Sequence, residues 1–423
     1  MCLKYIGKLF NILRWNCKER RLGWKELTLE RIHIELSNYC NAACPACPRC
    51  YYGTELVRPE LALSQIYYEN FIKFFSEDII SKINSIIFCG ANGDPLTARD
   101  ILPIIRYITT KSPNCLLRIH TNGGLRSPEF FKELAETLKL STNSAVIFSI
   151  DGLKNTNHIY RRKVDWDVLI KNVQNFIKNG GRAEWDFLIF KHNEHQIKEA
   201  EELAKELGFA AFNLKRALGF ESGEEYIGDM GVYDKDGKYI YSIFPPSEVR
   251  HRNCGCKKVV IKTSKDHISL KTYDKVNMLK YNPIANEKLN NFQSGCGLQD
   301  RADLKKIEYK KITCKSHLYD KAELFVNANG MVFPCCFIGT AVESGLATYE
   351  LNELRYLIKK AGIDNFSLHK RKIADILESG LFDEVFAKSW DRPSFKKGKI
   401  AYCTATCSDN NCIDRISMNE EEL

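Results

Sequence analysis

The chain has 423 residues, with 62 Lys and Arg against 53 Asp and Glu, which gives a formal net charge of +9. Apolar residues make up 44% of it, so a disordered or fibrous protein is excluded and two or three globular domains are expected. The basic surplus is spread along the chain, and no zinc-finger, RNP or phosphate-loop motif is present. No nucleic-acid partner is therefore expected.

The 17 cysteines are the most informative feature of the composition. A chain of this size does not need disulfides to hold a small core, and an odd number of cysteines cannot all pair within the chain. Metal binding or catalysis is the better explanation. No apolar run approaches the length of a membrane span, and basic residues interrupt the apolar N-terminus before a cleavable signal could form. A cytoplasmic protein with reduced thiols is predicted.

Residues 1–30 carry apolar residues at helical spacing with basic residues opposite. This pattern predicts an amphipathic helical extension that packs on the main domain. A helix that binds a membrane surface or a partner is the alternative.

Residues 31–220 alternate short β-rich runs with longer helical patterns. Ser127 and Pro128 supply an N-cap and a first-turn proline to one helix. Asn193 and Gln196 predict a capping box for another, which Gly208 ends. Six repeats predict an α/β fold, a partial (β/α)6 TIM-like barrel with a parallel sheet, with an open doubly wound sheet as the alternative. The six predicted strands are 32–36, 85–89, 116–120, 145–150, 186–190 and 210–214.

Beyond residue 220 the pattern changes. Residues 221–300 contain hairpin-like runs at 233–242 and 259–273 and are expected to connect two domains. Residues 301–423 are predicted to form a C-terminal α+β domain. Its clearest feature is a strand pair within 322–336, with Asn329 and Gly330 at the hairpin turn.

Three cysteines follow the first predicted strand directly, in the order Cys40, Cys44 and Cys47. Thiolates at this CxxxCxxC spacing, on a loop at the carboxyl end of a barrel strand, can all bind one metal cluster. A structural zinc site would need four ligands, and Cys47 with Cys50 could supply one of its close pairs. Three protein ligands on a [4Fe-4S] cluster would instead leave one iron with an open position.

This arrangement resembles the radical S-adenosylmethionine (SAM) superfamily, whose signature is CxxxCxxC after the first strand of a partial (β/α)6 barrel. The resemblance implies that Cys40, Cys44 and Cys47 hold a [4Fe-4S] cluster and that SAM chelates its fourth iron. In that family, one electron from the cluster cleaves SAM to give a 5′-deoxyadenosyl radical.

Two further positions resemble the parts of that family that bind the methionine end of SAM. Gly93 and Asp94, in the sequence GANGDP, look like the loop whose backbone carbonyls receive the methionine ammonium. Arg161 matches a basic position that often meets the methionine carboxylate, and a solvated surface charge is the alternative for it.

Two more loops resemble those that line the nucleoside. Thr121 and Asn122 belong to a TNG sequence after the third strand, and Ser149 and Asp151 belong to SIDG after the fourth. Their hydroxyl and carboxylate groups suit hydrogen bonds to a ribose. Each sequence alone is also a common turn.

A second group of cysteines lies near the C-terminus. Cys314, Gly330 and Cys335 are spaced like the CX9–15GX4C opening of SPASM and twitch auxiliary-cluster domains, and a CxxxC pair follows. The resemblance implies one auxiliary [4Fe-4S] cluster of the twitch type, with every iron ligated by the protein. The implied ligands are Cys314, Cys335, Cys403 and Cys407.

The remaining cysteines leave alternatives open. Cys412 could replace one of the close pair, and Cys336 could replace Cys335, although adjacent residues of a strand point in opposite directions. A zinc site with the same four thiolates is the alternative to the auxiliary cluster. The cysteines of the connecting region could hold a second metal, supply a substrate-facing thiol or simply stay reduced; they are Cys254, Cys256 and Cys296.

The resemblance covers about residues 30–412 and implies an enzyme that cleaves SAM and abstracts a substrate hydrogen. The auxiliary cluster would accept or relay an electron, and a flavodoxin or ferredoxin would be the electron donor. The substrate is a small molecule or a peptide, and residues 1–30 are too few for a leader-binding winged helix. The alternative is a non-catalytic iron–sulfur or zinc protein, against which the nucleoside-binding loops argue.

Overall fold

The computed structural model describes the barrel, most of the C-terminal region and part of the connection between them. Residues 1–21 of the predicted N-terminal helical extension lie outside the described residues, and residues 22–30 contain a 3₁₀ turn and the start of the first strand. Most of the run at 259–273 also lies outside them, as do six cysteines, Cys2, Cys17, Cys254, Cys256, Cys296 and Cys412. The described residues are 22–141, 144–217, 220–222, 225–226, 228–248, 251, 257–260, 308–314, 316–318, 321–343 and 349–407.

Six parallel strands form the barrel sheet. They are β1 (Thr28–Ile34), β2 (Ser85–Phe88), β3 (Leu116–Thr121), β4 (Ala145–Ser149), β5 (Ala183–Ile189) and β6 (Ala211–Arg216). Each strand pairs with the next one in the chain, so their order in space is the order in sequence. A doubly wound sheet would reverse its order part-way, so the partial barrel is confirmed and the alternative is wrong. The sheet does not close, because β6 has the antiparallel strand β11 (Lys257–Val260) on its other side.

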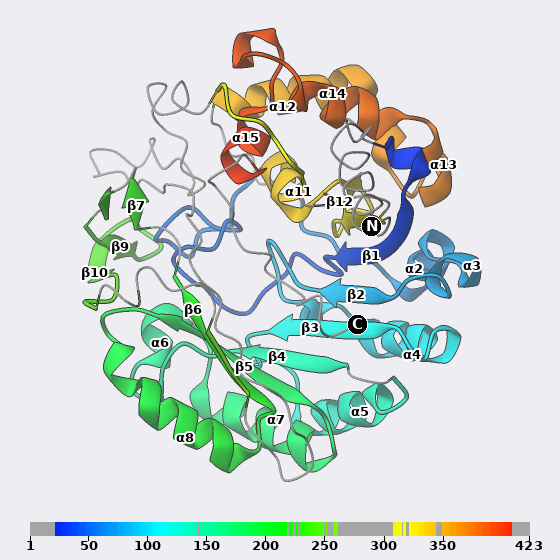
Figure 1. Ribbon diagram of the computed structural model, residues 1–423. Coiled ribbons are helices and arrows are strands. Elements are labelled where there is room, and N and C mark those ends of the chain that lie inside the picture. Colours follow the sequence, from blue (N-terminus) through cyan, green and yellow to red (C-terminus); the bar gives the residue numbers. More distant parts are fainter. Residues whose placement is uncertain are drawn as a thin grey trace, which may run out of the picture.

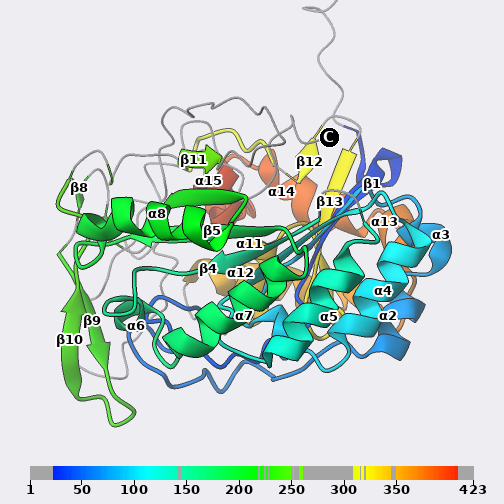
Figure 2. The same ribbon diagram turned by 90° about the horizontal axis from the view of Figure 1, so that it is seen from below.

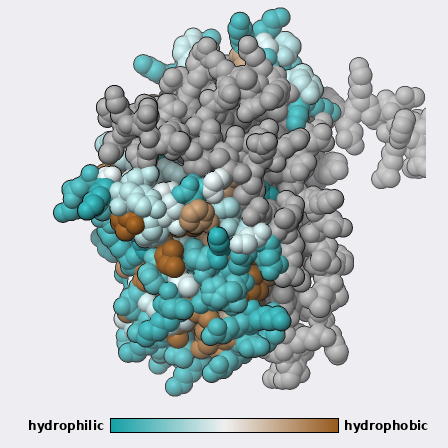
Figure 3. Space-filling view, turned by 90° about the vertical axis from the view of Figure 1, so that its left-hand side faces the viewer, coloured by the Kyte–Doolittle hydropathy of each residue, from teal (hydrophilic) through white to brown (hydrophobic). Residues whose placement is uncertain are grey.

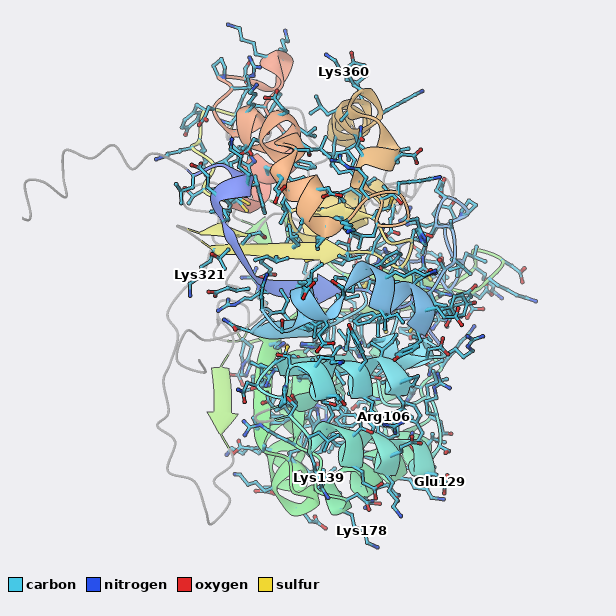
Figure 4. All side chains as sticks on the ribbon, turned by 90° about the vertical axis from the view of Figure 1, so that its right-hand side faces the viewer. Arg106, Glu129, Lys139, Lys178, Lys321 and Lys360 are labelled. Carbon is cyan, nitrogen blue, oxygen red and sulfur yellow. The ribbon has the colours of Figure 1, made fainter. Side chains whose placement is uncertain are left out.

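Helices cover the outer face of this sheet (Figures 1 and 2). Phe148 of β4 contacts Phe131 and Phe176 of two of these helices, with ring centroids 5.9 Å apart in both pairs. Charged side chains such as Glu129, Lys139 and Lys178 extend from the outside of the helical layer (Figure 4). The barrel helices are α2 (Tyr68–Phe74), α3 (Glu77–Ile80), α4 (Ile101–Lys111), α5 (Pro128–Leu138), α6 (Asn157–Tyr160), α7 (Trp166–Lys178) and α8 (Ile197–Leu207).

Two of the predicted helix ends are confirmed and one is wrong. Ser127 caps α5 by accepting a hydrogen bond from the Phe130 amide, and Gly208 ends α8 in the left-handed conformation with φ 87°. The capping box does not form. Asn193 instead donates to the carbonyls of Asp151 and Leu188, while Gln196 starts α8 after a 3₁₀ turn. A tertiary hydrogen bond has replaced the local cap.

The C-terminal region continues the barrel sheet. Strand β13 (Lys321–Val326) pairs in parallel with β1, and β14 (Val332–Phe333) returns antiparallel to it through the predicted turn, where Gly330 has φ 70°. The hairpin is confirmed, but its position beside β1 was not predicted. The helices of this region lie next to β1 at the top of Figure 1. They are α11 (Cys336–Glu343), α12 (Tyr349–Ala361), α13 (Ile373–Glu378), α14 (Lys388–Trp390) and α15 (Ala401–Cys407).

Shorter elements complete the structure. The predicted hairpin at 233–242 is confirmed as β9 (Met230–Tyr233) paired with β10 (Tyr239–Ile243). On the side of the molecule that carries it, hydrophilic surface predominates and hydrophobic residues are scattered (Figure 3). None of the helices in the described ranges is long and apolar enough to span a membrane. The other elements are β7 (Glu221–Ser222), β8 (Glu225–Tyr226), β12 (His317–Leu318), the π-helix Asp383–Ala387 and the 3₁₀ turns Trp24–Glu26, Pro95–Thr97, Glu194–Gln196, Ile363–Phe366 and Phe395–Lys397.

Candidate active site

The CxxxCxxC loop crosses the carboxyl ends of the barrel strands, to the left of the sheet in Figure 1. Burial raises the pKa of the Cys40 thiol, and charges on Asp94, Cys44 and Cys47 raise it further. Burial also raises the pKa of Cys47 to about 12, with Cys44 adding to the effect. Because Cys44 and Cys47 act on Cys40, and Cys44 acts on Cys47, the three lie together. Deprotonating them in this buried place needs compensating positive charge, which a metal cluster provides.

Hydrogen-bond donors surround these sulfur atoms. The Ala42 amide lies 3.4 Å from Cys40 Sγ, and Asn122 Nδ2 lies 3.7 Å from it. Arg161 Nη1 lies 3.7 Å from Cys44 Sγ. Donors directed at cysteine sulfur stabilise the thiolate and tune a bound cluster. The donor set and its surroundings therefore fit a cluster held by three thiolates.

Asp94 joins the second and third strand loops. Its carboxylate accepts hydrogen bonds from Thr121 Oγ1 at 2.9 and 3.0 Å, from the Asn122 amide at 2.8 Å and from Asn122 Nδ2 at 2.8 Å. The Leu96 amide donates to it at 3.0 Å. Burial raises the pKa of Asp94, and these donors lower it part of the way. The carboxylate thus fixes the TNG loop beside Cys40.

Gly93 lies where the second strand loop packs on the first. A Cβ on Gly93 would come within 2.2 Å of the Ser37 carbonyl oxygen and 2.6 Å of Asn38 Cα. Any larger residue would push the GANGDP loop away from the segment that leads into Cys40. This close approach explains the glycine without assigning it a ligand.

Asp151 and Arg161 form a buried ion pair after the fourth strand. Arg161 Nε lies 2.6 Å from Asp151 Oδ2, and the Leu188 amide donates to Asp151 Oδ1 at 2.7 Å. Asp151 is fully buried and the Arg161 side chain is 17% exposed. Burial raises the pKa of the Asp151 carboxyl, whereas the guanidinium lowers it. Ser149, two residues before Asp151 and the last residue of β4, pairs with Asp186 of β5.

A second group of cysteines lies together in the C-terminal region. The four predicted auxiliary cysteines line one hollow of about 350 Å³, open solvent included. Burial raises the pKa of Cys314, and charges on the other three raise it further. Apolar and aromatic side chains complete the wall. The cysteines are Cys314, Cys335, Cys403 and Cys407, and the rest of the lining is Ile312, Pro334, Phe337, Ile338, Phe386 and Trp390.

Four cysteines around one hollow could hold either a four-iron cluster or a single zinc ion. Four thiolates on one zinc ion each lie about 2.3 Å from it, whereas the body of a four-iron cluster holds its thiolates farther apart. Within the described ranges, no set of three or more His, Cys, Asp or Glu side chains is gathered so that it could hold one metal ion. The side chain of Trp390 also hydrogen-bonds Cys403, as expected for a thiolate ligand.

Cys336 does not line the hollow. It is the first residue of α11, and burial raises its pKa together with charges on Cys335, Glu323 and Cys89. The prediction that it points away from its neighbour Cys335 agrees with this placement, although a helix start rather than a strand sets the direction.

Residues 34–210 match the family model described as the Radical SAM superfamily. The barrel of this chain is a radical SAM domain. The match begins at the last residue of β1 and ends just before β6, and it contains Cys40, Cys44, Cys47 and all the loops described above. No protein of curated function matches the chain.

Solved structures similar to this chain include three with SAM bound. Streptococcus suis SuiB bound to S-adenosylmethionine is 14% identical, with 74% of this chain and 61% of that chain covered and a TM-score of 0.40. The anSMEcpe complex with AdoMet and a Cp18Cys peptide is 15% identical, covering 90% and 92%, at a TM-score of 0.46. BtrN in complex with AdoMet and 2-DOIA is 12% identical, with 90% of this chain and 93% of that chain covered and a TM-score of 0.38. The chain thus spans about 61% of the SuiB chain.

The structure adds residues that the sequence motifs did not identify. Asn41, inside the CxxxCxxC loop, accepts a hydrogen bond from Asn122 Nδ2 at 2.9 Å and donates to the Gly124 carbonyl at 3.3 Å. Its position in the sequence between Cys40 and Cys44 could have identified it as a site residue. Glu35 and Asn92 also meet beside the site, with the Asn92 amide donating to Glu35 at 2.5 Å. Nothing in the local sequence joins those two residues.

Proposed function

We propose that this radical SAM protein is an enzyme that reductively cleaves SAM and abstracts a hydrogen atom from its substrate. The observation that supports this most is found at one end of the barrel. There the three thiols and their N–H donors lie beside the Asp94 carboxylate, which joins the second and third strand loops. When bound, the [4Fe-4S] cluster with SAM would supply the electron that releases a 5′-deoxyadenosyl radical.

In this proposal Cys40, Cys44 and Cys47 hold the cluster and leave its fourth iron to SAM. Arg161 carries a positive charge next to Cys44 and would attract the methionine carboxylate. Its ion pair with Asp151 keeps the guanidinium oriented, so it is a binding residue held in place before the ligand arrives.

Five other residues are proposed to shape the SAM pocket. Asp94 holds the TNG loop, and Gly93 allows the loop backbone to lie close to the first cysteines. Thr121, Asn122 and Ser149 stand at the carboxyl ends of β3 and β4, where the ribose would bind. Because Asp94 already holds the side chains of Thr121 and Asn122, these two would shape the pocket wall. The polar ends of these strands form the site, whereas their outward-facing residues pack against helices.

We propose that Cys314, Cys335, Cys403 and Cys407 bind an auxiliary [4Fe-4S] cluster that accepts or relays an electron. The shared hollow and the mutual effect of the thiols on their pKa values support this ligand set. A flavodoxin or ferredoxin is the proposed electron donor, and the cytoplasm is the proposed location because the thiols must stay reduced.

The proposed substrate is a small molecule or a peptide. Among the similar structures, SuiB is bound to the precursor peptide SuiA, anSMEcpe to a Cp18Cys peptide and BtrN to 2-DOIA. The competing function is a non-catalytic iron–sulfur protein. The hydrogen bonds of Asp94 and the Asp151–Arg161 ion pair argue against a non-catalytic protein, because an electron carrier needs no preformed nucleoside pocket.

Anaerobic purification with iron and sulfide analysis, followed by incubation with SAM and dithionite, tests the proposal. About eight irons per chain and release of 5′-deoxyadenosine are expected. Zinc in place of iron in the C-terminal hollow would contradict the auxiliary cluster. Loaded protein that releases no 5′-deoxyadenosine would support the non-catalytic alternative.

A further inference from the structure

A fully buried carboxyl group and a half-buried one meet between the barrel and the C-terminal region. Glu35 directly follows β1, and Glu343 is the last residue of α11. The two carboxyl groups lie close enough to act on each other, and the buried Oε2 atom of Glu35 has no N–H donor. Glu35 is fully buried, so water does not solvate its carboxyl group. Two adjacent negative charges there would be strongly unfavourable. A hydrogen bond between two carboxyl groups requires that one of them carries a proton.

Amide groups supply the other contacts of this pair. The Asn92 backbone amide donates to Glu35 Oε1 at 2.5 Å, and the Gly93 amide also donates to Glu35. Asn92 Nδ2 donates to Glu343 Oε2 at 3.2 Å, and Asn329 Nδ2 donates to Glu343 Oε1 at 3.0 Å. Asn92 therefore binds both acids at once. Asn92 and Gly93 belong to the GANGDP loop of the proposed SAM site.

Helix α11 consequently connects the two proposed cofactor sites. It begins one residue after Cys335, which lines the auxiliary hollow, and it ends at Glu343, which holds the loop that carries Asp94. An eight-residue helix is about 12 Å long, so the connection is short and stiff.

We infer that Glu35 and Glu343 share one proton and that this protonated pair positions the GANGDP loop for SAM binding. They are positioning residues, because they act on SAM through Asn92 and Gly93. The inference rests on the proposed SAM site. Losing the shared proton would place two like charges side by side in a buried location and push α11 away from the loop.

The direction of the pH effect follows from the pKa values. Burial raises the pKa of Glu35, and the Glu343 charge raises it further. Burial raises the pKa of Glu343 to about 7, although its amide partners lower it. A proton that is held with a raised pKa stabilises the contact at low pH, and the stabilisation is lost as the pH rises above that value. Within the described residues, the Cys89 thiol directly after β2 also interacts with Glu35. Burial raises the pKa of Cys89 to about 12, so this thiol stays neutral in this range.

The test compares SAM affinity at pH 6 to 9 in anaerobic, fully loaded wild-type, Glu343→Gln and Glu343→Ala proteins. Wild-type affinity is expected to fall above pH 7, by up to tenfold per pH unit. Glutamine donates and accepts hydrogen bonds without a titrating proton, so Glu343→Gln should lose this pH dependence. Glu343→Ala leaves Asn92 Nδ2 without an acceptor and should weaken binding about tenfold at pH 6. Glu378→Gln, on the exposed face of α13, is the control.

Infrared spectroscopy provides a second measurement that does not depend on SAM. At pH 6 the wild-type protein should show the carbonyl band of a buried protonated carboxyl, which Glu35→Gln removes and Glu378→Gln keeps. Equal pH dependence of SAM binding in wild type and Glu343→Gln would overturn the positioning role, and absence of the band would overturn the shared proton. A wild-type protein that binds no SAM at any pH would refute the proposed function, while the infrared result would still decide on the acid pair.

Discussion

Replacing Arg161 with methionine separates the structural role of the buried ion pair from its role in the reaction. Arg161→Met leaves the Asp151 carboxylate fully buried without its cation, which was 2.6 Å away. Breaking a buried pair from one side costs about 3–5 kcal/mol, whereas replacing both partners with apolar residues is often close to neutral. Arg161→Met should therefore lower the free energy of unfolding by about 3–5 kcal/mol, and Arg161→Met combined with Asp151→Leu should recover most of it.

Activity should behave differently from stability. Both variants lack the guanidinium that lies 3.7 Å from Cys44 Sγ, so neither should release 5′-deoxyadenosine at more than a small fraction of the wild-type rate. Urea unfolding followed by circular dichroism gives the stabilities, and chromatography of the deoxynucleoside gives the activities. Lys163→Met removes an exposed cation nearby and should change stability by less than about 1 kcal/mol. A double variant that is as unstable as the single one, or that is active, would refute the reasoning.

Four further substitutions test the rest of the site. Cys44→Ala should abolish 5′-deoxyadenosine release and reduce the iron content to about four per chain, and loss of all iron would contradict two separate sites. Cys407→Ala should also remove about half of the iron, while SAM cleavage without substrate continues; iron analysis with electron paramagnetic resonance distinguishes the two losses. Cys336→Ala should keep about eight irons, since its side chain does not line the hollow, and a lower count would make it a ligand. Asp94→Asn, which cannot accept all the hydrogen bonds of the carboxylate, should lower stability by about 1–3 kcal/mol and slow SAM cleavage at least tenfold, and an unchanged rate would remove Asp94 from the site.

The six barrel strands could be predicted because each is a local pattern. Strands such as 145–150 are short, apolar and β-branched, and the helices between them have an apolar face and readable ends. The position of β13 could not be predicted in this way. Its residues show that it is a strand, but its partner β1 lies almost 300 positions earlier in the chain, and parallel pairing leaves no mark in either strand alone.

The residues of the candidate site also differ in whether the local sequence could predict them. The thiols could be found because their spacing within 40–47 is fixed by the loop that bends them around one cluster. The same local logic failed at Asn193, where two backbone carbonyls from other segments compete for the side chain. Glu35 and Glu343 are far apart in the sequence, and only the pairing of β1 with β13 brings α11 to the barrel mouth. The contact between Glu35 and Glu343 could therefore not be predicted from the local sequence around either residue.

The most direct measurement is 5′-deoxyadenosine release from anaerobic protein with a full complement of iron, supplied with SAM and dithionite, beside the Cys44→Ala variant. We predict that the wild-type protein releases 5′-deoxyadenosine and that Cys44→Ala, which retains its C-terminal iron, releases none. Fully loaded wild-type protein that binds SAM but never cleaves it, or equal release from Cys44→Ala, would contradict the assignment of radical chemistry to this barrel.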